Sequence, residues 1–205
     1  QYFEVNVAYE AQSGRAMVVY DASASASSSI QYRLWSGTAW SAESTITAPA
    51  GITATSELYS TVVASDPGSN RLAIAAKNEA EQVWAAVWDG SAWGHEHLVT
   101  TSGVQLAENH ATMSLAFESQ SGDLLLAYGK ATGPSVYYQT WTSASGWSAE
   151  SAAVSLGGTD VPYIVKLYAD PYSNTVMLGA QDSAGDLHMA TWSGSAWGRS
   201  RWPLS

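Results

Sequence analysis

The segment "LWSGTAW" at 34–40 decides the fold, because it recurs three more times along the 205-residue chain. The later copies are "VWDGSAW" at 87–93, "TWTSASGW" at 140–147 and "TWSGSAW" at 191–197. Their first tryptophans, Trp35, Trp88, Trp141 and Trp192, lie 53, 53 and 51 residues apart. A repeat of this length is typical of architectures in which each copy is one supersecondary unit. We therefore predict four copies of one unit.

A second motif runs in phase with the first. It reads "YEAQSGR" at 9–15, "SDPGSNR" at 65–71, "FESQSGD" at 117–123 and "ADPYSNT" at 169–175. Each copy starts from an acidic residue and continues with Pro or a small residue, then Ser, then Gly or Asn. Proline at the first corner of a turn and Gly or Asn where φ is positive are typical of a tight hairpin. Each copy therefore contains at least two hairpins.

The runs between these motifs are predicted to be strands. In the first copy they are "FEVNVAY", "AMVVY", "IQYRLW" and "WSAESTI", which are rich in Val, Ile, Tyr and Trp. Four strands in each of four copies give sixteen short strands, and no stretch keeps a helical period. The second strand of each copy is almost entirely apolar, which indicates burial on both faces, whereas the fourth is polar.

Four-stranded units repeated radially are the plan of a β-propeller. The predicted fold is therefore all-β, a four-bladed β-propeller of four-stranded antiparallel blades in a single domain over 1–205, with blades at about 1–50, 51–103, 104–157 and 158–205. We expect the four blades to close into a monomer. The alternative is self-assembly, in which two chains join into eight blades.

Tryptophans that recur in every blade are better explained by what forms a blade than by one ligand site. Trp35 and Trp40 flank a hairpin, where aromatic residues on adjacent strands can stack. We expect these residues to form a structural core. The alternative is that some of the rings are exposed for binding.

The composition narrows the classes of partner. The chain carries 8 Lys and Arg against 18 Asp and Glu, a net charge of −10. Nucleic acid and anionic membrane surfaces are therefore not expected as partners. No apolar stretch is long enough to span a membrane, and no signal peptide is recognised at the start. The low charge content and abundance of Ser, Thr, Ala, Gly and Trp favour an extracellular or cell-surface protein, as a mature product or a domain cut from something longer.

Catalytic and metal-binding patterns are scarce, and no cofactor is expected. His95 and His97 alternate along a predicted strand and could share a face, but no third zinc ligand is evident. Glu43, Glu96 and Glu150 recur at one position, which we interpret as solvated charge on an edge strand. We predict no metal site and no catalytic residues.

A propeller glycosidase of the sialidase kind would need an arginine cluster and paired carboxylates. Arg15 and Arg71 lie at equivalent hairpin ends in different blades, and this placement gives no sign of convergence on one pocket. An enzyme is therefore not expected.

The segments that enter the first strand of each blade differ between copies, and such loops commonly carry ligand sites in propellers. Sugars need planar apolar surfaces beside fixed donors and acceptors. These segments contain both, so we predict a ligand site composed of Glu57, Tyr59, Glu108, Asn109, His110, Asp160 and Tyr163.

The tandem units with a "W-x-G-x-x-W" hairpin resemble extracellular lectin propellers of the tectonin, tachylectin and fungal fucose-lectin kinds. The "DP-x-SN" turns at 66–70 and 170–174 are similar to turns in many bacterial propellers, and the blade number resembles hemopexin domains. The resemblance implies a non-enzymatic extracellular recognition or adhesion module with a glycan or cell-surface partner. A structural subunit or tip domain acting through protein contacts is the main alternative, and a propeller glycosidase or lyase is the second.

Overall fold

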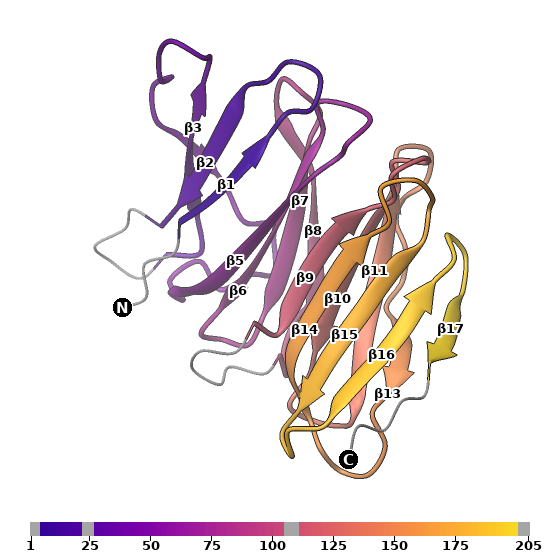
Figure 1. Cartoon of the computed structure of the whole chain (residues 1–205). Helices are drawn as coiled ribbons and strands as arrows, with labels where there is room; N and C mark the ends of the chain where they lie inside the picture. The colour runs from indigo at the N-terminus through magenta and orange to yellow at the C-terminus, as the bar shows by residue number, and fades with distance from the viewer. Residues whose placement is uncertain (1–4, 22–26, 105–110, 201–205) are drawn as a thin grey trace. The chain divides into compact units, whose positions relative to one another are not determined.

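The computed structural model describes residues 5–21, 27–104 and 111–200 (Figure 1). These residues form seventeen strands and no helix, arranged in four antiparallel sheets. The predicted all-β fold, built from four blade-like sheets, is confirmed. Within the described ranges there is also no helix that could cross a membrane.

Each sheet is a meander in which strands adjacent in sequence are hydrogen-bonded neighbours, except for the last two strands of the third sheet. The first sheet contains β1 (Val5–Tyr9), β2 (Ala16–Tyr20), β3 (Ile30–Trp35) and β4 (Ser44–Ile46). The second contains β5 (Leu58–Ser65), β6 (Leu72–Asn78), β7 (Val83–Trp88) and β8 (Trp93–Thr100). The third contains β9 (Met113–Phe117), β10 (Leu124–Gly129), β11 (Ser135–Thr142), β12 (Gly146–Trp147) and β13 (Ser151–Ser155). The fourth contains β14 (Pro162–Ala169), β15 (Val176–Asp182), β16 (Leu187–Trp192) and β17 (Trp197–Ser200).

The fourth strand of the first and third sheets differs from the sixteen-strand prediction. In the third sheet it is split into β12 and β13, which both pair with β11. Here the Ser148 hydroxyl accepts a hydrogen bond from the Thr140 amide at 2.9 Å, in place of a ladder carbonyl. In the first sheet the Ser41 hydroxyl likewise accepts a hydrogen bond from the Leu34 amide at 3.0 Å, and β4 starts only at Ser44. In the second and fourth sheets a glycine follows the tryptophan, and the strand continues without interruption.

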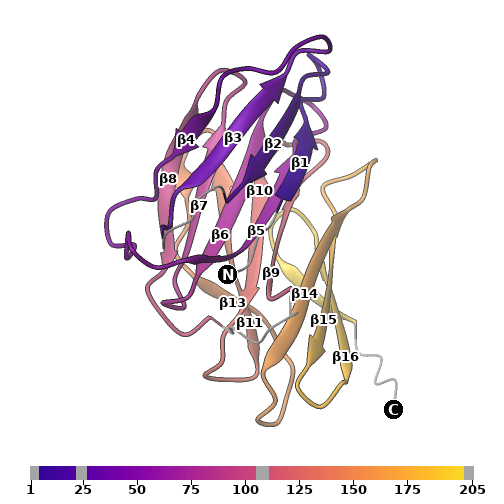
Figure 2. The ribbon, with the colours of Figure 1, turned by 90° about the vertical axis from the view of Figure 1, so that its left-hand side faces the viewer.

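The chain divides into two compact units, an N-terminal unit over Gln1–Ser102 and a C-terminal unit over Gly103–Ser205. The N-terminal unit contains the first and second sheets, and Figure 2 presents the first sheet with its strands side by side. The C-terminal unit contains the third and fourth sheets. That all four form a single domain stays a prediction.

Each unit has its own apolar core. In the N-terminal unit, Met17 and Ile30 of the first sheet pack with Ile74 and Trp84 of the second. In the C-terminal unit, residues of the third and fourth sheets form the corresponding core, among them Leu125, Val136, Val165, Leu178 and Trp192. The second strands β6 and β10 are buried along their whole length, as predicted. By contrast, β15 alternates between buried and exposed residues, because only one of its faces is covered.

The tryptophan hairpins are mainly structural, as predicted. Trp88, Trp141 and Trp192 are buried, each at the end of the third strand of its sheet. Trp35 and Trp40 stack with ring centroids 5.3 Å apart, but Trp40 is exposed. The first hairpin therefore differs from the later ones in leaving a ring open to solvent.

Candidate functional site

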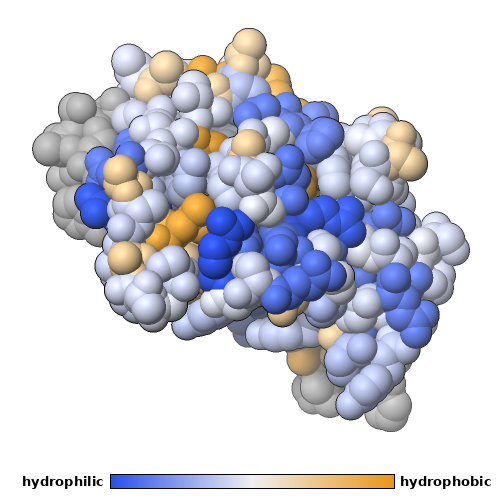
Figure 3. All heavy atoms as spheres, turned by 90° about the horizontal axis from the view of Figure 1, so that it is seen from above, coloured by the Kyte–Doolittle hydropathy of each residue, from blue (hydrophilic) through white to orange (hydrophobic). Residues whose placement is uncertain are grey.

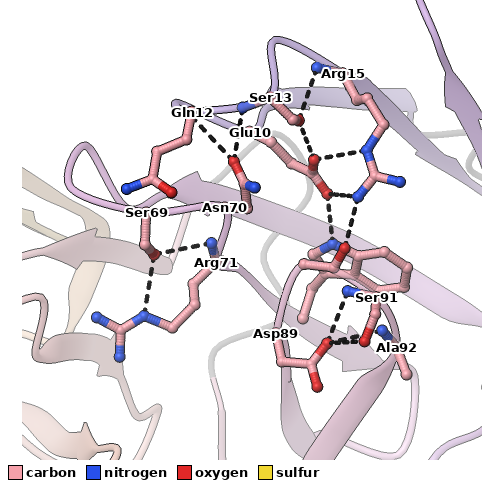
Figure 4. Close-up of polar contacts among 12 residues, drawn as sticks. Glu10, Gln12, Ser13, Arg15, Ser69, Asn70, Arg71, Asp89, Ser91 and Ala92 are labelled. Carbon is pink, nitrogen blue, oxygen red and sulfur yellow. Dashed lines mark hydrogen bonds and ion pairs between the residues drawn. The ribbon is translucent and has the colours of Figure 1, made fainter.

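Two hairpins interlock at one end of the N-terminal unit (Figure 4). They are the β1–β2 hairpin of the first sheet and the β5–β6 hairpin of the second. The side-chain oxygen of Asn70 accepts hydrogen bonds from the amides of Gln12 and Ser13, at 3.0 and 2.8 Å. Gln12 in turn donates to the carbonyl of Gly68 at 2.8 Å. We call this arrangement the amide clamp; it fixes one sheet to the other through backbone groups.

A buried carboxylate lies behind the amide clamp. Glu10 accepts two hydrogen bonds from Arg15, both at 2.7 Å, and one from Nε1 of Trp88 at 2.7 Å. The hydroxyl of Ser13 donates a further short bond. Burial by itself would raise the pKa of Glu10, but the bonds from Arg15, Ser13 and Trp88 outweigh it and hold the pKa below its usual value. Glu10 therefore remains ionised and joins the two sheets.

The turn between Trp88 and Trp93 lies beside the Arg15 guanidinium. Nη2 of Arg15 donates to the carbonyl of Gly90 at 2.6 Å. In the same turn, Oδ1 of Asp89 accepts from the amides of Ser91 and Ala92, at 2.7 and 2.8 Å. The bond from the Ala92 amide, followed by those from Ser91, lowers the pKa of Asp89. The turn therefore carries an exposed carboxylate one residue before the carbonyl that Arg15 binds.

Aromatic rings support this turn from below. Tyr32 of the first sheet lies with its ring centroid 6.0 Å from Trp88 and 6.2 Å from Trp93, both edge to face. The two indoles are 5.7 Å apart. Such pairs stabilise beyond their buried area and hold rings in fixed orientations. We call Tyr32, Trp88 and Trp93 the aromatic base; their packing holds the turn in a fixed position.

The C-terminal unit repeats this framework with different charges. Asn174 accepts from the amides of Gln120 and Ser121, at 3.0 and 2.9 Å, and Trp192 donates to Glu118 at 2.6 Å. The aromatic base recurs as Tyr138, Trp192 and Trp197. However, the positions of Arg15, Arg71 and Asp89 are occupied by Asp123, Thr175 and Ser193.

The amide clamp brings together the hairpins that carry Arg15 and Arg71, which the sequence did not predict. Each arginine nevertheless pairs with its own acid. Arg71 donates to Asp66 at 3.0 and 2.8 Å, as Arg15 does to Glu10. The two guanidiniums therefore do not form the shared carboxylate-binding cluster that a sialidase-like enzyme needs.

The loop residues predicted as a ligand site are only partly described. Glu57 and Tyr59 lie at the start of the second sheet, where the Lys77 ammonium is 5.1 Å from the Tyr59 ring. Asp160 and Tyr163 belong to the other unit, where Asp160 accepts from Ser183 at 3.0 Å. Glu108, Asn109 and His110 lie outside the described residues. The loop site stays a prediction.

The alternation of His95 and His97 is interrupted. On β7 two steps separate Ala85 from Val87, but the paired residues on β8, His97 and Gly94, are three steps apart. This extra residue is a β-bulge, and His95 takes a positive φ of 55° within it. The prediction that the two histidines share a strand face is wrong for that reason. In the part of the chain that the structure describes, no group of three or more His, Cys, Asp or Glu is placed to hold a metal.

The recurring glutamates were expected to be solvated charges, and Glu96 is exposed, but Glu43 and Glu150 also bind a tyrosine hydroxyl. Glu43 accepts a hydrogen bond from the Tyr20 hydroxyl at 2.7 Å. Glu150 accepts one from Tyr128 and another from Lys130 at 2.8 Å. Burial, and then Glu150, raise the pKa of the Tyr128 hydroxyl. The signal in the sequence was the tyrosine at or next to the end of the second strand in these two copies, Tyr20 and Tyr128.

Comparisons with known proteins agree with this architecture. No protein-family model and no curated protein matches the chain. Among solved structures it is similar to the six-bladed fucose-binding lectin of Aleuria aurantia, at a TM-score of 0.55 and 17% identity over 91% of this chain and 56% of that one. The BP39L lectin of Burkholderia pseudomallei gives 0.62 and 13% over 98% and 55%. The SapL1 lectin, solved with α-methyl fucoside, gives 0.57 and 15% over 98% and 63%. The chain spans less than two thirds of each of these lectins, and the likeness shows that it has the fold of β-propeller lectins.

Proposed function

We propose that the chain is a non-enzymatic, extracellular glycan-binding module whose ligand binds beside Arg15 and Asp89, at the hairpin end of the N-terminal unit. The similarity in fold to lectin propellers supports the class of ligand. Figure 3 shows a face on which residues of hydrophilic and intermediate hydropathy predominate and apolar residues are scattered among them, a kind of surface that sugars can bind.

The observation that carries the position of this site is the contrast between the two units. The C-terminal unit forms the same amide clamp and the same bond between an indole and a buried glutamate with Asp123 at the position of Arg15. Arg15 is therefore not required to build the framework. Its presence beside the turn of Asp89 is better explained by a ligand.

The chemistry of the two groups suits neighbouring hydroxyls of a sugar. Among the described residues, nothing bonds to Nη1 of Arg15 or to Oδ2 of Asp89. The guanidinium donates and the carboxylate accepts, so one hydroxyl can accept from Arg15 while the next donates to Asp89. The half-buried Trp93 offers an apolar ring surface at the same turn. The lectins with similar folds include structures with fucosides, so methyl α-L-fucoside is the first ligand to test.

A glycan array followed by titration calorimetry tests the proposal. Arg15→Gln and Asp89→Asn should each weaken binding by about tenfold or more, ~1.4 kcal/mol. The matched controls are Asp123→Asn and Ser193→Ala at the equivalent positions of the C-terminal unit, which should bind like the unmodified chain. Absence of any binder at millimolar concentration contradicts glycan binding. Loss of binding on Asp160→Ala or Asn109→Ala, with Arg15→Gln unaffected, would move the site to the predicted loops.

A further inference from the structure

Within each unit, one face of each sheet is buried against its neighbour. The first sheet buries the face that carries Ala8, Met17 and Ile30 against the second sheet. The fourth sheet buries the face that carries Val165 and Leu167 against the third. These two contacts show which face of a sheet packs against the next sheet in the chain and which face packs against the previous one.

The opposite face of the first sheet carries exposed apolar side chains around Arg33, which lies in register with Val7 and Val18 and contacts Glu43 at 4.0 Å. Side chains alternate along a strand, so Val5, Val7 and Tyr9 lie on the face opposite Ala8. Tyr9 is 60% exposed and Trp40 is 51% exposed. The register of the strands aligns Tyr9 with Ala16 and Ala16 with Trp35, so the tryptophan pair belongs to the same face. We call it the leading face.

The fourth sheet also has a face with exposed apolar side chains, which lie beside the exposed Lys166. Tyr168 is 71% exposed and lies directly opposite Met177, which is 43% exposed. Leu187 of β16 is also exposed, whereas Val165 and Leu167, on the other face, are buried. We call this exposed surface the trailing face.

The repeat shows what each exposed face corresponds to. The copies can be aligned on the acidic residue of the first hairpin in each sheet. In this alignment Val5 and Val7 are equivalent to Val165 and Leu167, which are buried against the preceding sheet. By the same alignment, Tyr168 and Met177 occupy the positions of Ala8 and Met17, which are buried against a following sheet. The leading and trailing faces are therefore the two complementary halves of one more contact of the kind that each unit already contains.

We propose that the leading face of one copy of this chain packs on the trailing face of a second copy. Both halves of the contact occur on every chain and are unlike each other, so the association is head to tail and closes when a ring of copies is complete. In this arrangement Met189, at the position of Tyr32 and Tyr138, packs against the Trp35–Trp40 pair of the next copy. Each copy carries a net charge of −10, so added salt strengthens the association by screening repulsion.

Sedimentation velocity over a wide range of concentration tests this proposal without any glycan present. The unmodified chain should form species well above 21.7 kDa, and more of them in higher salt. Val7→Glu and Tyr168→Glu should each abolish them while circular dichroism stays unchanged, because both side chains are exposed. Tyr9→Lys is a second variant of the leading face, should Val7→Glu fail to fold. The matched control is Tyr172→Glu, a tyrosine that is 84% exposed in a turn of the same sheet, and it should associate normally.

A mixture of two variants gives the decisive result. Val7→Glu retains the trailing face and Tyr168→Glu retains the leading face, so together they should form a dimer of about twice 21.7 kDa and nothing larger. The proposal is overturned if the unmodified chain is monomeric at every concentration, as for a chain closed on itself or one that needs a different partner. It is also overturned if either variant still self-associates, because that would show a symmetric contact.

Discussion

The two units build the same interlocked hairpins from different charges. In the N-terminal unit the acids Glu10 and Asp66 each pair with an arginine, Arg15 or Arg71. In the C-terminal unit those arginines are replaced by Asp123 and Thr175, yet the clamp and the indole–carboxylate bond are kept. The amide clamp and the buried glutamate are thus the structural elements, and the ion pairs are additions.

A second contrast lies in the turns that follow β6 and β15. In the N-terminal unit the turn is held by a neutral side chain: Asn78 accepts from the Gln82 amide at 3.0 Å. In the C-terminal unit Asp182 takes this position and accepts from the amides of Ala184 and Asp186 and pairs with His188 at 2.8 Å. Of these two turns, the one after β15 therefore has hydrogen bonds that depend on ionisation, and the one after β6 is held by a neutral side chain.

The tryptophan that donates to a buried glutamate occurs at equivalent positions in both units, and its removal should lower the stability of the fold most. Trp88→Ala and Trp192→Ala each delete a buried ring from an aromatic base and the donor to a buried glutamate. We expect each to lower the free energy of unfolding by about 3–5 kcal/mol, measured by urea denaturation. A change in melting temperature under about two degrees for either variant would show that the rings are not structural.

The ionised turn should make the C-terminal unit sensitive to acid. Burial alone would raise the pKa of Asp182, but bonds from His188, Asp186 and Ala184 hold it below the usual value. Because the folded pKa lies below the unfolded value of about 3.9, this stabilisation is complete above that value and is lost as pH falls through the folded pKa.

Asp182→Asn, which introduces the residue of the N-terminal unit, tests this difference. It should cost about 1.5–3 kcal/mol at neutral pH, since it removes hydrogen bonds to a charged group. It should also flatten the fall in stability on acidification, measured by urea unfolding at a series of pH values. An equally steep fall in the variant would assign the acid sensitivity to another group.

The amide clamp should contribute equally to both units. Asn70→Ala and Asn174→Ala each remove one acceptor that serves two backbone amides. These amides are exposed and can bond to water instead, so we expect a loss of about 1 kcal/mol in each case, measured by thermal unfolding. If only one of the two variants were strongly destabilised, the two amide clamps would not be equivalent in their contribution to stability.

Arg15→Gln should have the smallest effect on stability, about 1 kcal/mol or less, since Arg15 is partly exposed and Glu118 forms its bonds without an arginine. The measurement is urea unfolding of the variant beside Asp123→Asn. If Arg15→Gln unfolds the chain, the arginine is structural after all and the argument for a ligand beside it fails.

Much of the fold was readable in the sequence because turns and strands are local. The turns that start from an acidic residue and the tryptophan hairpins predicted the sheets and the order of their strands. The splitting of the fourth strand was also visible, as Ser41 and Ser148 stand where Gly94 and Gly198 occur in the uninterrupted copies. What the pattern could not give was the burial of each sheet face, which depends on the sheet that packs on it.

The candidate site was harder to predict for the same reason. Glu10 and Trp88 are 78 residues apart and meet only when two sheets pack. One signal was available: the odd copies carry Glu10 and Glu118, where the even copies have the shorter Asp66 and Asp170. In each unit the glutamate of the odd sheet bonds to the tryptophan of the even sheet, so the repeating element is a pair of sheets.

The bond between an indole and a buried carboxylate also gives the molecule two natural spectroscopic reporters. Among the tryptophans that the structure describes, Trp88 and Trp192 donate Nε1–H to a glutamate, at 2.7 and 2.6 Å. Such protons should resonate far downfield in a proton NMR spectrum and exchange with solvent only when their unit opens. One reporter lies in each unit, so their exchange rates measure separately how often each half of the chain opens.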